Sequence, residues 1–445
     1  MTIAGSDSGG GAGIQADLKA FAAYGVHGTC VITAITAQNT YSVTAVHVLP
    51  PDMVAEQIKV VVEDLPVKAA KTGMLYNSEI IEVVAANIKR YSIPLVVDPV
   101  MIAKSGALLL REDAINSLVD VLLPVAMVVT PNRMEAERLS GMKITNLREA
   151  RRAAVKISEL GCKAVVVKGG HLEGDQVVDV LYHEGSFYEF SSPRLPPRNT
   201  HGTGCTFSAA IAAGLAKGLF LPEAVRAAKE FTFKAIKHGP SLGKGHGPVN
   251  PTGEVVEKAE RFEALMELYK AIELVEAESA LAKLSPETQI NIAVALPMAE
   301  SLDEVAGVPG RIVNLGDRLK ASSCPRFGAS RHVGRAVLTA MKYEPRVRAG
   351  MNIKYSKEIV EAAKSLGLTV SYYDRREEPP EVKAKEGATI PWGISEAIKR
   401  VNAVPDLVYH FGDWGKEPMC IIFGKTAVEV VNKAIAIARK LKEAS

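Results

Sequence analysis

The sequence predicts an α/β protein: a domain with a central, mostly parallel sheet, followed by a second, smaller α/β domain. The chain has 445 residues, more than one hydrophobic core usually supports. Short apolar runs alternate with helical stretches up to about residue 250, and a stretch dense in glycine and proline, Lys237–Gly253, then breaks the pattern. We therefore expect domains at 1–250 and 284–440, joined by a helical linker at 251–283.

The apolar runs of the first domain have the composition of buried parallel strands, because each is short and rich in Val, Ile or Ala. They are Cys30–Ile35, Lys68–Thr72, Leu95–Val97, Met127–Thr130 and Ala164–Val167. Helical stretches between them include Asp52–Val62, Ser78–Arg90 and Leu147–Leu160. This alternation predicts helices on both faces of a parallel sheet. Glu184-Gly185 predicts the turn of a hairpin within residues 177–190. In the second domain we expect strands near Ile292–Ala295, Leu368–Tyr372 and Met419–Ile422.

Composition and charge exclude several classes of protein. Apolar residues make up 47% of the chain and charged residues 23%, as in ordinary globular proteins. The net charge of +3 is too small to indicate a nucleic-acid or membrane partner. The five scattered cysteines form no CxxC pair, which fits a reducing cytosol and argues against a disulfide scaffold. With no signal peptide or membrane-length apolar stretch in the sequence, we expect a cytoplasmic protein that acts on small molecules.

The most informative motif is the glycine-rich turn Asn199–Thr206, which runs directly into a helix-forming stretch. Gly202 and Gly204 let the backbone approach a ligand without a Cβ in the way. The free amides and the dipole of the following helix make a site for an anion such as phosphate. Cys205 lies in the first turn, where we expect the positive field to lower the pKa of its thiol. A phosphate site that holds a polarised thiol predicts phosphoryl transfer.

A second glycine cluster, Gly9–Gly13, lies near the start of the chain. Gly11-x-Gly13-x-x-Ala16 fits the looser dinucleotide fingerprint, but residues 29–51 lack the acid that would hold a ribose hydroxyl. A turn that only packs, or a loop that closes over a small substrate, are the alternatives. Further polar motifs favour the loop, since most follow the carboxyl ends of predicted strands, where open α/β sheets bind ligands. These motifs contain Gln38, Asp98, Asn132, Glu135 and Lys168.

Residues 2–19, with Thr36–Thr40 and the Gly-Thr-Gly-Cys turn, resemble the hydroxymethylpyrimidine and phosphomethylpyrimidine kinases of thiamine biosynthesis. That family belongs to the ribokinase-like superfamily, and the resemblance covers about the first 250 residues. It implies a three-layer domain that uses ATP and Mg²⁺. It also implies two successive phosphorylations of one pyrimidine, first on its hydroxymethyl group and then on the monophosphate.

The resemblance implies roles for the residues around the pyrimidine. Gln38 would hydrogen-bond the aminopyrimidine edge, in a pocket that Gly5, Asp17 and Met74 help to form. Cys205 stands where most of the superfamily carries an aspartate base, so its thiolate would accept the hydroxyl proton. The alternative is that Cys205 is only a small residue that fits beneath the substrate.

The resemblance to the kinase family also implies which residues bind phosphate and metal. The expected set for ATP phosphates is Lys168, Gly202, Thr203, Gly204 and Asn132. Glu135 and Asp98 are the expected metal ligands, a sparse set that suits Mg²⁺ because this ion keeps several waters. Lys104-Ser105-Gly106 would either touch phosphate or form a solvated turn, and the role of His201 stays open.

Four clusters of the second domain combine glycines with cationic and polar residues. They are Gly310–Val313, Phe327–Arg335, Asn352–Ser356 and Gly412–Pro418. Arginine and exposed backbone suit phosphate or pyrophosphate recognition. Each cluster alone would more often be a solvated loop, but together they indicate an anion site.

Parts of these clusters, with Asn291–Ala295, resemble the archaeal-type thiamine-phosphate synthase domain over about residues 284–440. That family joins the pyrimidine diphosphate to hydroxyethylthiazole phosphate and releases pyrophosphate. Its catalytic arginine and histidine would fall on Arg311 and His332. The departing charge needs fixed cationic donors, which fits these residue types.

Two alternatives stay open. Similar domains also act as ligand-sensing modules that bind thiamine phosphates without turning them over, although those regulators carry a DNA-binding segment. The first domain would then be a pyrimidine or pyridoxal-type kinase attached to a sensor. In both cases the partners are small molecules, and we expect a homo-oligomer.

Overall fold

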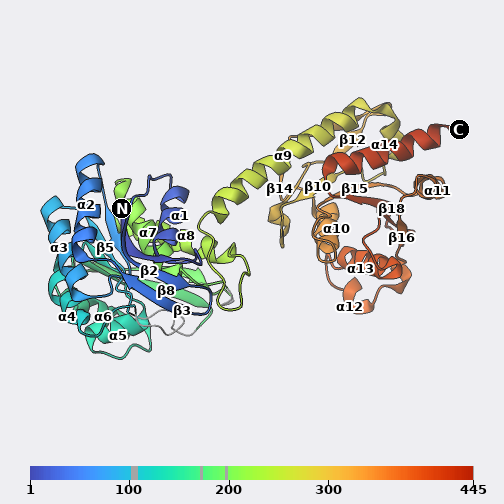
Figure 1. Ribbon diagram of the computed structural model, residues 1–445. Helices are drawn as coiled ribbons and strands as arrows, with labels where there is room; N and C mark the ends of the chain where they lie inside the picture. The colour runs from blue at the N-terminus through green and yellow to red at the C-terminus, as the bar shows by residue number, and fades with distance from the viewer. Residues whose placement is uncertain (102–108, 171–173, 196–198, 444–445) are drawn as a thin grey trace. The chain divides into compact units, whose positions relative to one another are not determined.

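The computed structural model describes residues 1–101, 109–170, 174–195 and 199–443. The chain divides into two compact units, Met1–Val256 and Glu257–Ser445 (Figure 1). The predicted phosphate contact at Lys104-Ser105-Gly106 lies outside the described residues. Among the helices that the structure describes, none has the length and apolar character needed to span a bilayer.

The first unit is built on a sheet of order β3-β2-β1-β4-β5-β6-β7-β8-β9. The strands are β1 (Thr2–Asp7), β2 (Cys30–Gln38), β3 (Val43–Val48), β4 (Ala70–Thr72), β5 (Leu95–Val97), β6 (Val128–Val129), β7 (Ala164–Val167), β8 (Gln176–His183) and β9 (Ser186–Pro193). Strands β2, β1, β4, β5, β6 and β7 are parallel to one another, whereas β3, β8 and β9 pair antiparallel at the two edges. The carboxyl ends of six strands therefore meet along one edge.

Helices cover both faces of this sheet (Figure 1). One face packs against α1 (Gly13–Ala23), α7 (Thr203–Ala216) and α8 (Leu221–Lys237). The other packs against α2 (Pro51–Asp64), α3 (Ser78–Tyr91), α4 (Ala114–Ser117), α5 (Arg133–Ser140), α6 (Leu147–Ser158) and the turns Leu118–Leu122 and Leu123–Val125. Alternate residues of each strand enter opposite cores: Val96 and Val128 face the first group of helices, and Val97 and Val129 the second.

The local predictions for this unit are largely confirmed. The predicted hairpin forms between β8 and β9, and both turn residues, Glu184 and Gly185, have left-handed φ values of 48° and 74°. Strand β2 continues to Gln38, three residues beyond its predicted end, so that Gln38 lies at the edge of the sheet where the carboxyl ends of the parallel strands meet. Strand β1 was not among the predicted strands; it lies directly before the glycine cluster and pairs with both β2 and β4.

The second unit contains a sheet of order β14-β11-β10-β15-β18-β17-β16. Its strands are β10 (Ile292–Ala295), β11 (Val305–Gly307), β14 (Arg326–Phe327), β15 (Ala349–Lys354), β16 (Val370–Tyr372), β17 (Leu407–His410) and β18 (Met419–Gly424). Neighbouring strands are antiparallel except β16 and β17. A small ribbon of β12 (Ile312–Asn314) and β13 (Leu319–Ala321) lies outside this sheet. The predicted strands near residues 292–295, 368–372 and 419–422 are confirmed.

Two groups of helices cover the second sheet. One face packs against α10 (Arg331–Met341) and α13 (Thr389–Val401). The other packs against α9 (Gly253–Ala277), α11 (Lys357–Ser365), α14 (Ala427–Glu443) and the turn Ser279–Leu284. The short α12 (Pro380–Lys383) precedes α13. Because Leu268 and Val275 of α9 are fully buried in this core, much of the segment predicted as a linker packs as part of the second unit.

Candidate functional site

The first unit contains a cavity of about 610 Å³ at the carboxyl ends of its parallel strands. Nearly every residue that the sequence assigns to pyrimidine, phosphate or metal contributes to its wall. These are Gly5, Gln38, Met74, Asp98, Asn132, Glu135, Lys168, Gly202, Thr203, Gly204 and Cys205. Asp17 is the exception, since it is fully buried behind the wall. The functions of these residues stay predictions, but their convergence on one cavity supports a single site.

The two glycine segments meet backbone to backbone beside this cavity. Gly202, the N-cap of α7, has a φ of +83°, and a Cβ there would lie 1.8 Å from the carbonyl oxygen of Gly11. Gly13 has a φ of +56°, and its Cβ would lie 2.4 Å from the carbonyl oxygen of Gly5. Both positions therefore require glycine for conformation and for space. The opening cluster packs tightly and also lines the cavity through Gly13.

His201, whose role the sequence leaves open, connects the glycine-rich turn Asn199–Thr206, called here the phosphate turn, to the glycine cluster Gly9–Gly13, called here the opening loop. Its Nε2 lies 3.0 Å from Oδ2 of Asp7. The Asp7 carboxylate also accepts hydrogen bonds from the amides of Gly9, Gly11 and Ala12. Burial opposes ionisation, but these hydrogen bonds outweigh it and hold the pKa of Asp7 below its ordinary value. Asp7 is therefore an ionised link between the two segments.

Gln38 presents its amide at the cavity wall. Oε1 accepts a hydrogen bond of 3.2 Å from Thr36, and Nε2 lies 3.4 Å from Nε2 of His201. His201 donates from that nitrogen when it bonds the Asp7 carboxylate, so it offers Gln38 no lone pair there. The amide is thus only weakly held and is available to a ligand edge that carries both a donor and an acceptor.

Sequence reasoning missed Lys71, which forms the floor of the cavity. Its ammonium lies 2.9 Å and 3.0 Å from the two carboxylate oxygens of Asp17, and both side chains are fully buried. Asp17 also accepts a 2.6 Å hydrogen bond from Thr2. Burial is the largest single influence and disfavours the ammonium, but the Asp17 charge, the Asp17 hydrogen bond and the other acidic groups nearby together outweigh it and raise the pKa of Lys71 above its ordinary value. The available signal was a lysine in the interior of the predicted strand 68–72, which begins with a second lysine, Lys68. Asp17 thus acts by holding Lys71.

The prediction that the helix start lowers the pKa of Cys205 is wrong. Burial raises the pKa of this thiol to about 11, and the nearby carboxylates of Asp17 and Asp98 add to the shift. Lys71 acts in the opposite direction but does not outweigh them. The sequence shows that Cys205 begins a helix, but not how deeply it is packed or which charges surround it. The resting thiol is therefore neutral at pH 7.

Asp98, Lys168 and Glu135 form a charged group at the strand ends. The Lys168 ammonium lies 3.1 Å from Oδ1 of Asp98. A Cβ on Gly204 would come within 3.3 Å of Asp98 and 3.4 Å of Lys168, so the backbone of the phosphate turn lies directly over this pair. Burial and the charge of Asp98 raise the pKa of Glu135 to about 7, although Lys168 acts against them. The group holds two acids and one cation beneath the predicted phosphate site.

The spacing of Asn132 and Glu135 also has a local cause. Oδ1 of Asn132 accepts a 3.0 Å hydrogen bond from the Glu135 amide, and Oε2 of Glu135 accepts a 2.8 Å bond from the Asn132 amide. This reciprocal capping box begins α5. Within residues 1–101, 109–170, 174–195 and 199–443, no cluster of three or more His, Cys, Asp or Glu side chains is arranged to hold a metal.

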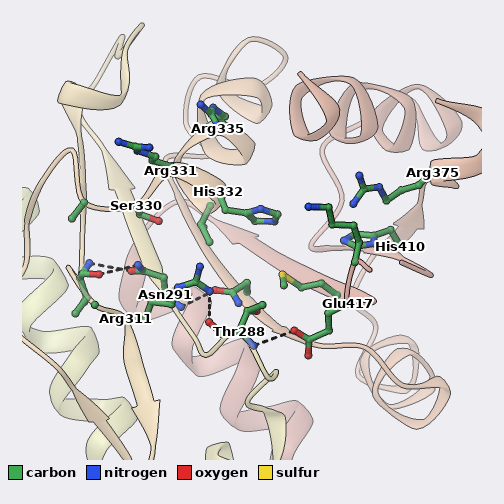
Figure 2. Close-up of a pocket in the computed structure, with 17 residues that line it drawn as sticks. Thr288, Asn291, Arg311, Ser330, Arg331, His332, Arg335, Arg375, His410 and Glu417 are labelled. Atoms are coloured by element: carbon green, nitrogen blue, oxygen red, sulfur yellow. Dashed lines mark hydrogen bonds between the residues drawn. The ribbon is translucent and has the colours of Figure 1, made fainter. Parts of the chain in front are cut away.

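The second unit contains a cavity of about 500 Å³ in which all four polar clusters meet (Figure 2). The clusters contribute Gly310, Arg311, Ser330, Arg331, His332, Arg335, Asn352, Lys416 and Glu417. Arg311 and His332, the predicted catalytic pair, therefore line the same cavity. The Glu417 carboxylate accepts hydrogen bonds from the amides of Glu287 and Thr288, so this acid is engaged at the rim.

The loop backbone fixes the position of Arg311. Its φ of +73° follows a φ of +68° at Gly310, and a left-handed conformation is unfavourable for arginine. Nη1 of Arg311 donates to the carbonyl of Thr288, and its own carbonyl accepts a 2.7 Å hydrogen bond from Ser322. Strain held in place by several contacts is typical of a functional position.

His332 lies in the first turn of α10, which Ser330 precedes. Its Nε2 is buried and has no hydrogen-bond partner among the described residues. Burial, with repulsion from Arg311, Arg375 and Arg335, lowers the pKa of His332 to about 4. The neutral ring is therefore the form present at pH 7.

Arg375 and His410 line this cavity too, and sequence reasoning missed both. Arg375 follows β16, and His410 is the last residue of β17. Neither lies in a glycine-rich cluster, so the only signal was a polar residue at a strand end. Burial, with Arg375 and His332 nearby, lowers the pKa of His410 to about 3.

Two family profiles match the chain: phosphomethylpyrimidine kinase over residues 7–250 and thiamine-phosphate synthase ThiN over residues 267–436. The thiamine biosynthesis bifunctional protein ThiED of Geobacter sulfurreducens is 49% identical over 251 residues, 56% of this chain and 51% of that protein. The hydroxymethylpyrimidine/phosphomethylpyrimidine kinase of Synechococcus elongatus is 50% identical over 250 residues, 56% of this chain and 95% of that protein. The chain thus spans about half of the first relative and nearly all of the second.

Two solved structures share the fold of the first unit. The ADP complex of pyridoxal kinase from Bacillus subtilis is 40% identical, with a TM-score of 0.54, and covers 57% of this chain and 97% of its own. Pyridoxal kinase from Staphylococcus aureus with AMP-PCP and pyridoxal is 37% identical, with a TM-score of 0.53, and covers 57% and 93%. These likenesses confirm the predicted ribokinase-like fold class.

Proposed function

We propose that this chain, which belongs to the phosphomethylpyrimidine kinase family, makes thiamine phosphate from a pyrimidine alcohol in three steps. The first unit uses ATP to phosphorylate 4-amino-5-hydroxymethyl-2-methylpyrimidine and then its monophosphate. The second unit joins the resulting diphosphate to hydroxyethylthiazole phosphate and releases pyrophosphate. The observation that carries the proposal is that each unit gathers its predicted site residues, apart from Asp17, around one cavity that holds cationic side chains.

In the first unit the phosphates of ATP lie at the start of α7. The Gly204 amide is among those that have no partner within the helix, and the Thr203 amide makes only a 3.4 Å hydrogen bond to the carbonyl of Thr200. Lys168 lies directly below them, 3.1 Å from Asp98. Since phosphoryl transfer depends mostly on positioning and charge neutralisation, these donors supply the main contribution of the protein.

Asp98 and Glu135 fit a magnesium site, because Mg²⁺ takes one or two carboxylates and completes its shell with water and phosphate oxygens. When bound, the ion neutralises charge on the phosphates. Glu135, whose pKa is raised to about 7, changes charge near neutral pH and favours its carboxylate form when a cation is present.

Cys205 stays the candidate base for the substrate hydroxyl. Because its pKa is raised to about 11, the thiolate fraction grows about tenfold per pH unit below that value. A thiolate base therefore predicts a kcat that rises between pH 7 and pH 10. It also predicts that Cys205→Ala loses most turnover while the Kd for ATP changes little. Unchanged turnover in Cys205→Ala would instead show that Cys205 only fills space.

In the second unit the bond between the pyrimidine methylene carbon and the diphosphate oxygen breaks. The lone pair of the thiazole nitrogen forms the new carbon–nitrogen bond. The electron pair of the broken carbon–oxygen bond leaves with the pyrophosphate. Arg311 provides a permanent cation for the departing charge. The neutral His332 ring, whose Nε2 has no protein partner among the described residues, offers a hydrogen-bonding position beside it.

A pyridoxal kinase activity is the second candidate for the first unit, because two pyridoxal kinases are 37% and 40% identical to it. Measuring kcat/KM for hydroxymethylpyrimidine and for pyridoxal separates the candidates. A preference for pyridoxal would overturn the pyrimidine assignment.

One experiment tests the complete proposal. The full chain is given pyrimidine alcohol, ATP, Mg²⁺ and hydroxyethylthiazole phosphate, and thiamine phosphate and pyrophosphate are measured. Formation of both is the expected result. Tight binding of the phosphorylated precursors without release of pyrophosphate would identify the second unit as a sensor. A cytoplasmic location and homo-oligomeric assembly stay part of the proposal.

A further inference from the structure

We propose that Arg375 and His410 form a second anion site, which binds the phosphate of the thiazole substrate at the end of the second-unit cavity opposite Arg311. The inference rests on the proposed synthase function and adds a specificity site to it. Four observations support it: strand order, the charges around His332 and His410, the fixed ring of His410, and the buried Nε of Arg375, which has no hydrogen-bond partner among the described residues.

The sheet order places the two arginines on opposite sides of the site. Arg311 follows β11 and Arg375 follows β16, and strands β10, β15, β18 and β17 lie between them. Figure 2 shows Arg311 and Arg375 at opposite ends of the cavity, with His332 between them and His410 beside Arg375. The cavity therefore has two cationic ends rather than one.

The charges that act on the two histidines agree with this layout. Arg311, Arg375 and Arg335 all lower the pKa of His332, in addition to burial, which places that ring within reach of both ends. For His410, after burial, the cationic influence comes from Arg375, with His332 as a further neighbour. His410 therefore belongs to the Arg375 end.

His410 is a neutral donor with a fixed tautomer. It is 3% exposed, and its Nδ1 accepts a 3.1 Å hydrogen bond from the amide of Gly412. A neutral ring that accepts at Nδ1 carries its proton at Nε2. Because Gly412 has a φ of +81°, its amide position depends on a glycine conformation. The ring thus presents one N–H donor at a set place on the cavity wall.

Arg375 keeps its hydrogen-bonding capacity for a ligand. Its side chain is only 13% exposed, and its Nε is buried without a partner among the described residues. Nη2 forms an ion pair with the buried carboxylate of Glu378, but at 3.8 Å the two groups are too far apart for a hydrogen bond. A buried donor without a partner is costly, and a phosphate offers several oxygens to satisfy it. Arg375 and His410 together supply a cation and a neutral donor.

The chemistry of the reaction requires two anion sites. One substrate carries a diphosphate on the carbon that is attacked, and the other carries a phosphate on its hydroxyethyl arm. In an in-line displacement the thiazole nitrogen approaches that carbon on the face away from the departing pyrophosphate. The second phosphate therefore belongs on the side of the cavity away from Arg311, where Arg375 lies.

The test compares two thiazole substrates, the phosphate and the free alcohol, with preformed pyrimidine diphosphate and the full chain. For Arg375→Gln we expect the KM for thiazole phosphate to rise at least about tenfold, since a charged hydrogen bond is lost. We expect the KM for pyrimidine diphosphate to change less than about twofold. The preference for thiazole phosphate over the alcohol, measured as a ratio of kcat/KM, should largely disappear. His410→Gln keeps a donor and should lose less of this preference than His410→Leu.

Arg376→Gln is the matched control. Arg376 is the next residue along the chain, but its side chain is 82% exposed and pairs with Asp374 outside the cavity. Its removal should leave both KM values unchanged. A thermal melt of each variant checks that the second unit stays folded, and the His410 pair tests the same site if Arg375→Gln does not fold.

Two results would overturn the inference: an unchanged preference for the phosphorylated thiazole in Arg375→Gln, or a rise in KM confined to pyrimidine diphosphate. If the unmodified chain forms no thiamine phosphate, the proposed synthase function fails instead. Calorimetric titration of thiazole phosphate into the unmodified chain and into Arg375→Gln then still decides this inference. Equal affinities would reject it.

Discussion

The two cavities both attract oxyanions, but they balance their charges differently. In the first unit each lysine at the cavity faces a buried carboxylate: Lys71 faces Asp17, Lys168 faces Asp98, and Lys229 faces Asp179 at 3.0 Å. In the second unit the described residues show no ion pair for Arg311, Arg331 or Arg335, whereas Arg375 has a longer ion pair of 3.8 Å with the buried Glu378.

This difference indicates how each site receives its ligand. A cavity whose cations are already neutralised gains little from a bare anion and fits a nucleotide that brings its own metal ion. A cavity with an excess of fixed cations is stabilised when an anion enters. The first unit is therefore suited to positioning substrates, and the second to holding a departing negative charge.

The largest expected effect concerns the most deeply buried pair. Lys71→Met leaves the Asp17 carboxylate buried without its cation, which should cost the first unit about 3–5 kcal/mol. The double variant Asp17→Leu with Lys71→Met should recover most of that loss. Chemical denaturation of the full chain measures both, with the second unit as an internal reference. Equal stability of the single and double variants would contradict a buried ion pair.

Inorganic pyrophosphate should separate the two cavities. At about one hundred times its Kd it should stabilise the second unit by about 2.7 kcal/mol. Without Mg²⁺ it should have little effect on the first unit. Scanning calorimetry of the full chain, repeated with Arg311→Gln, measures the difference. Equal stabilisation of both units would remove the distinction between the two sites.

Acid should weaken the second unit through its buried histidines. The pKa values of His332 and His410 are lowered from 6.5 to about 4 and about 3, so the unfolded chain binds their protons first as the pH falls. Their stabilising contribution is complete above about pH 6.5 and is lost below it. Each histidine contributes a slope of up to about 1.4 kcal/mol per pH unit. Denaturation of the full chain at pH 7 and pH 5 should show the loss, and His410→Gln should reduce it. An identical loss in that variant would contradict the prediction.

The smallest effect distinguishes the two roles of Asn132. Asn132→Ala removes the cap of α5 and should cost about 1 kcal/mol. Asn132→Ser restores a capping oxygen but not the amide. If Asn132 contributes to phosphate binding, the serine variant recovers stability without recovering kinase activity. Full recovery of both would reduce Asn132 to a helix cap.

The sequence predicts best what local residue types determine. The glycine at position 202 predicts its own left-handed conformation, because few residues other than glycine adopt a φ of +83° next to another backbone segment. The strands from 95 to 97 and from 164 to 167 follow from composition, and the structure has them at the same bounds. Arg311 and His332 could be predicted as site residues because each lies in a recognisable cluster of glycines and cationic residues.

The remainder depends on contacts between distant parts of the chain. Lys71 meets Asp17 across 54 positions, and nothing near either residue indicates the pair. The pKa of Cys205 depends on packing around the helix start, which the helix alone does not reveal. Arg375 and His410 become neighbours only when β16 and β17 pair in parallel. Local patterns therefore indicated which residues line the two cavities, but not how charge is arranged there.

The hydrogen bond between Asp7 and His201 joins residues 194 positions apart. This separation has a consequence for the biosynthesis of the protein. The backbone of His201 makes two further hydrogen bonds: its amide donates to the carbonyl of Gly247, and its carbonyl accepts from the amide of Val249. A nascent chain cannot complete this arrangement until about residue 250 has left the ribosome. The turn therefore reaches its final structure only when the first unit is fully synthesised, while the second unit is still being made.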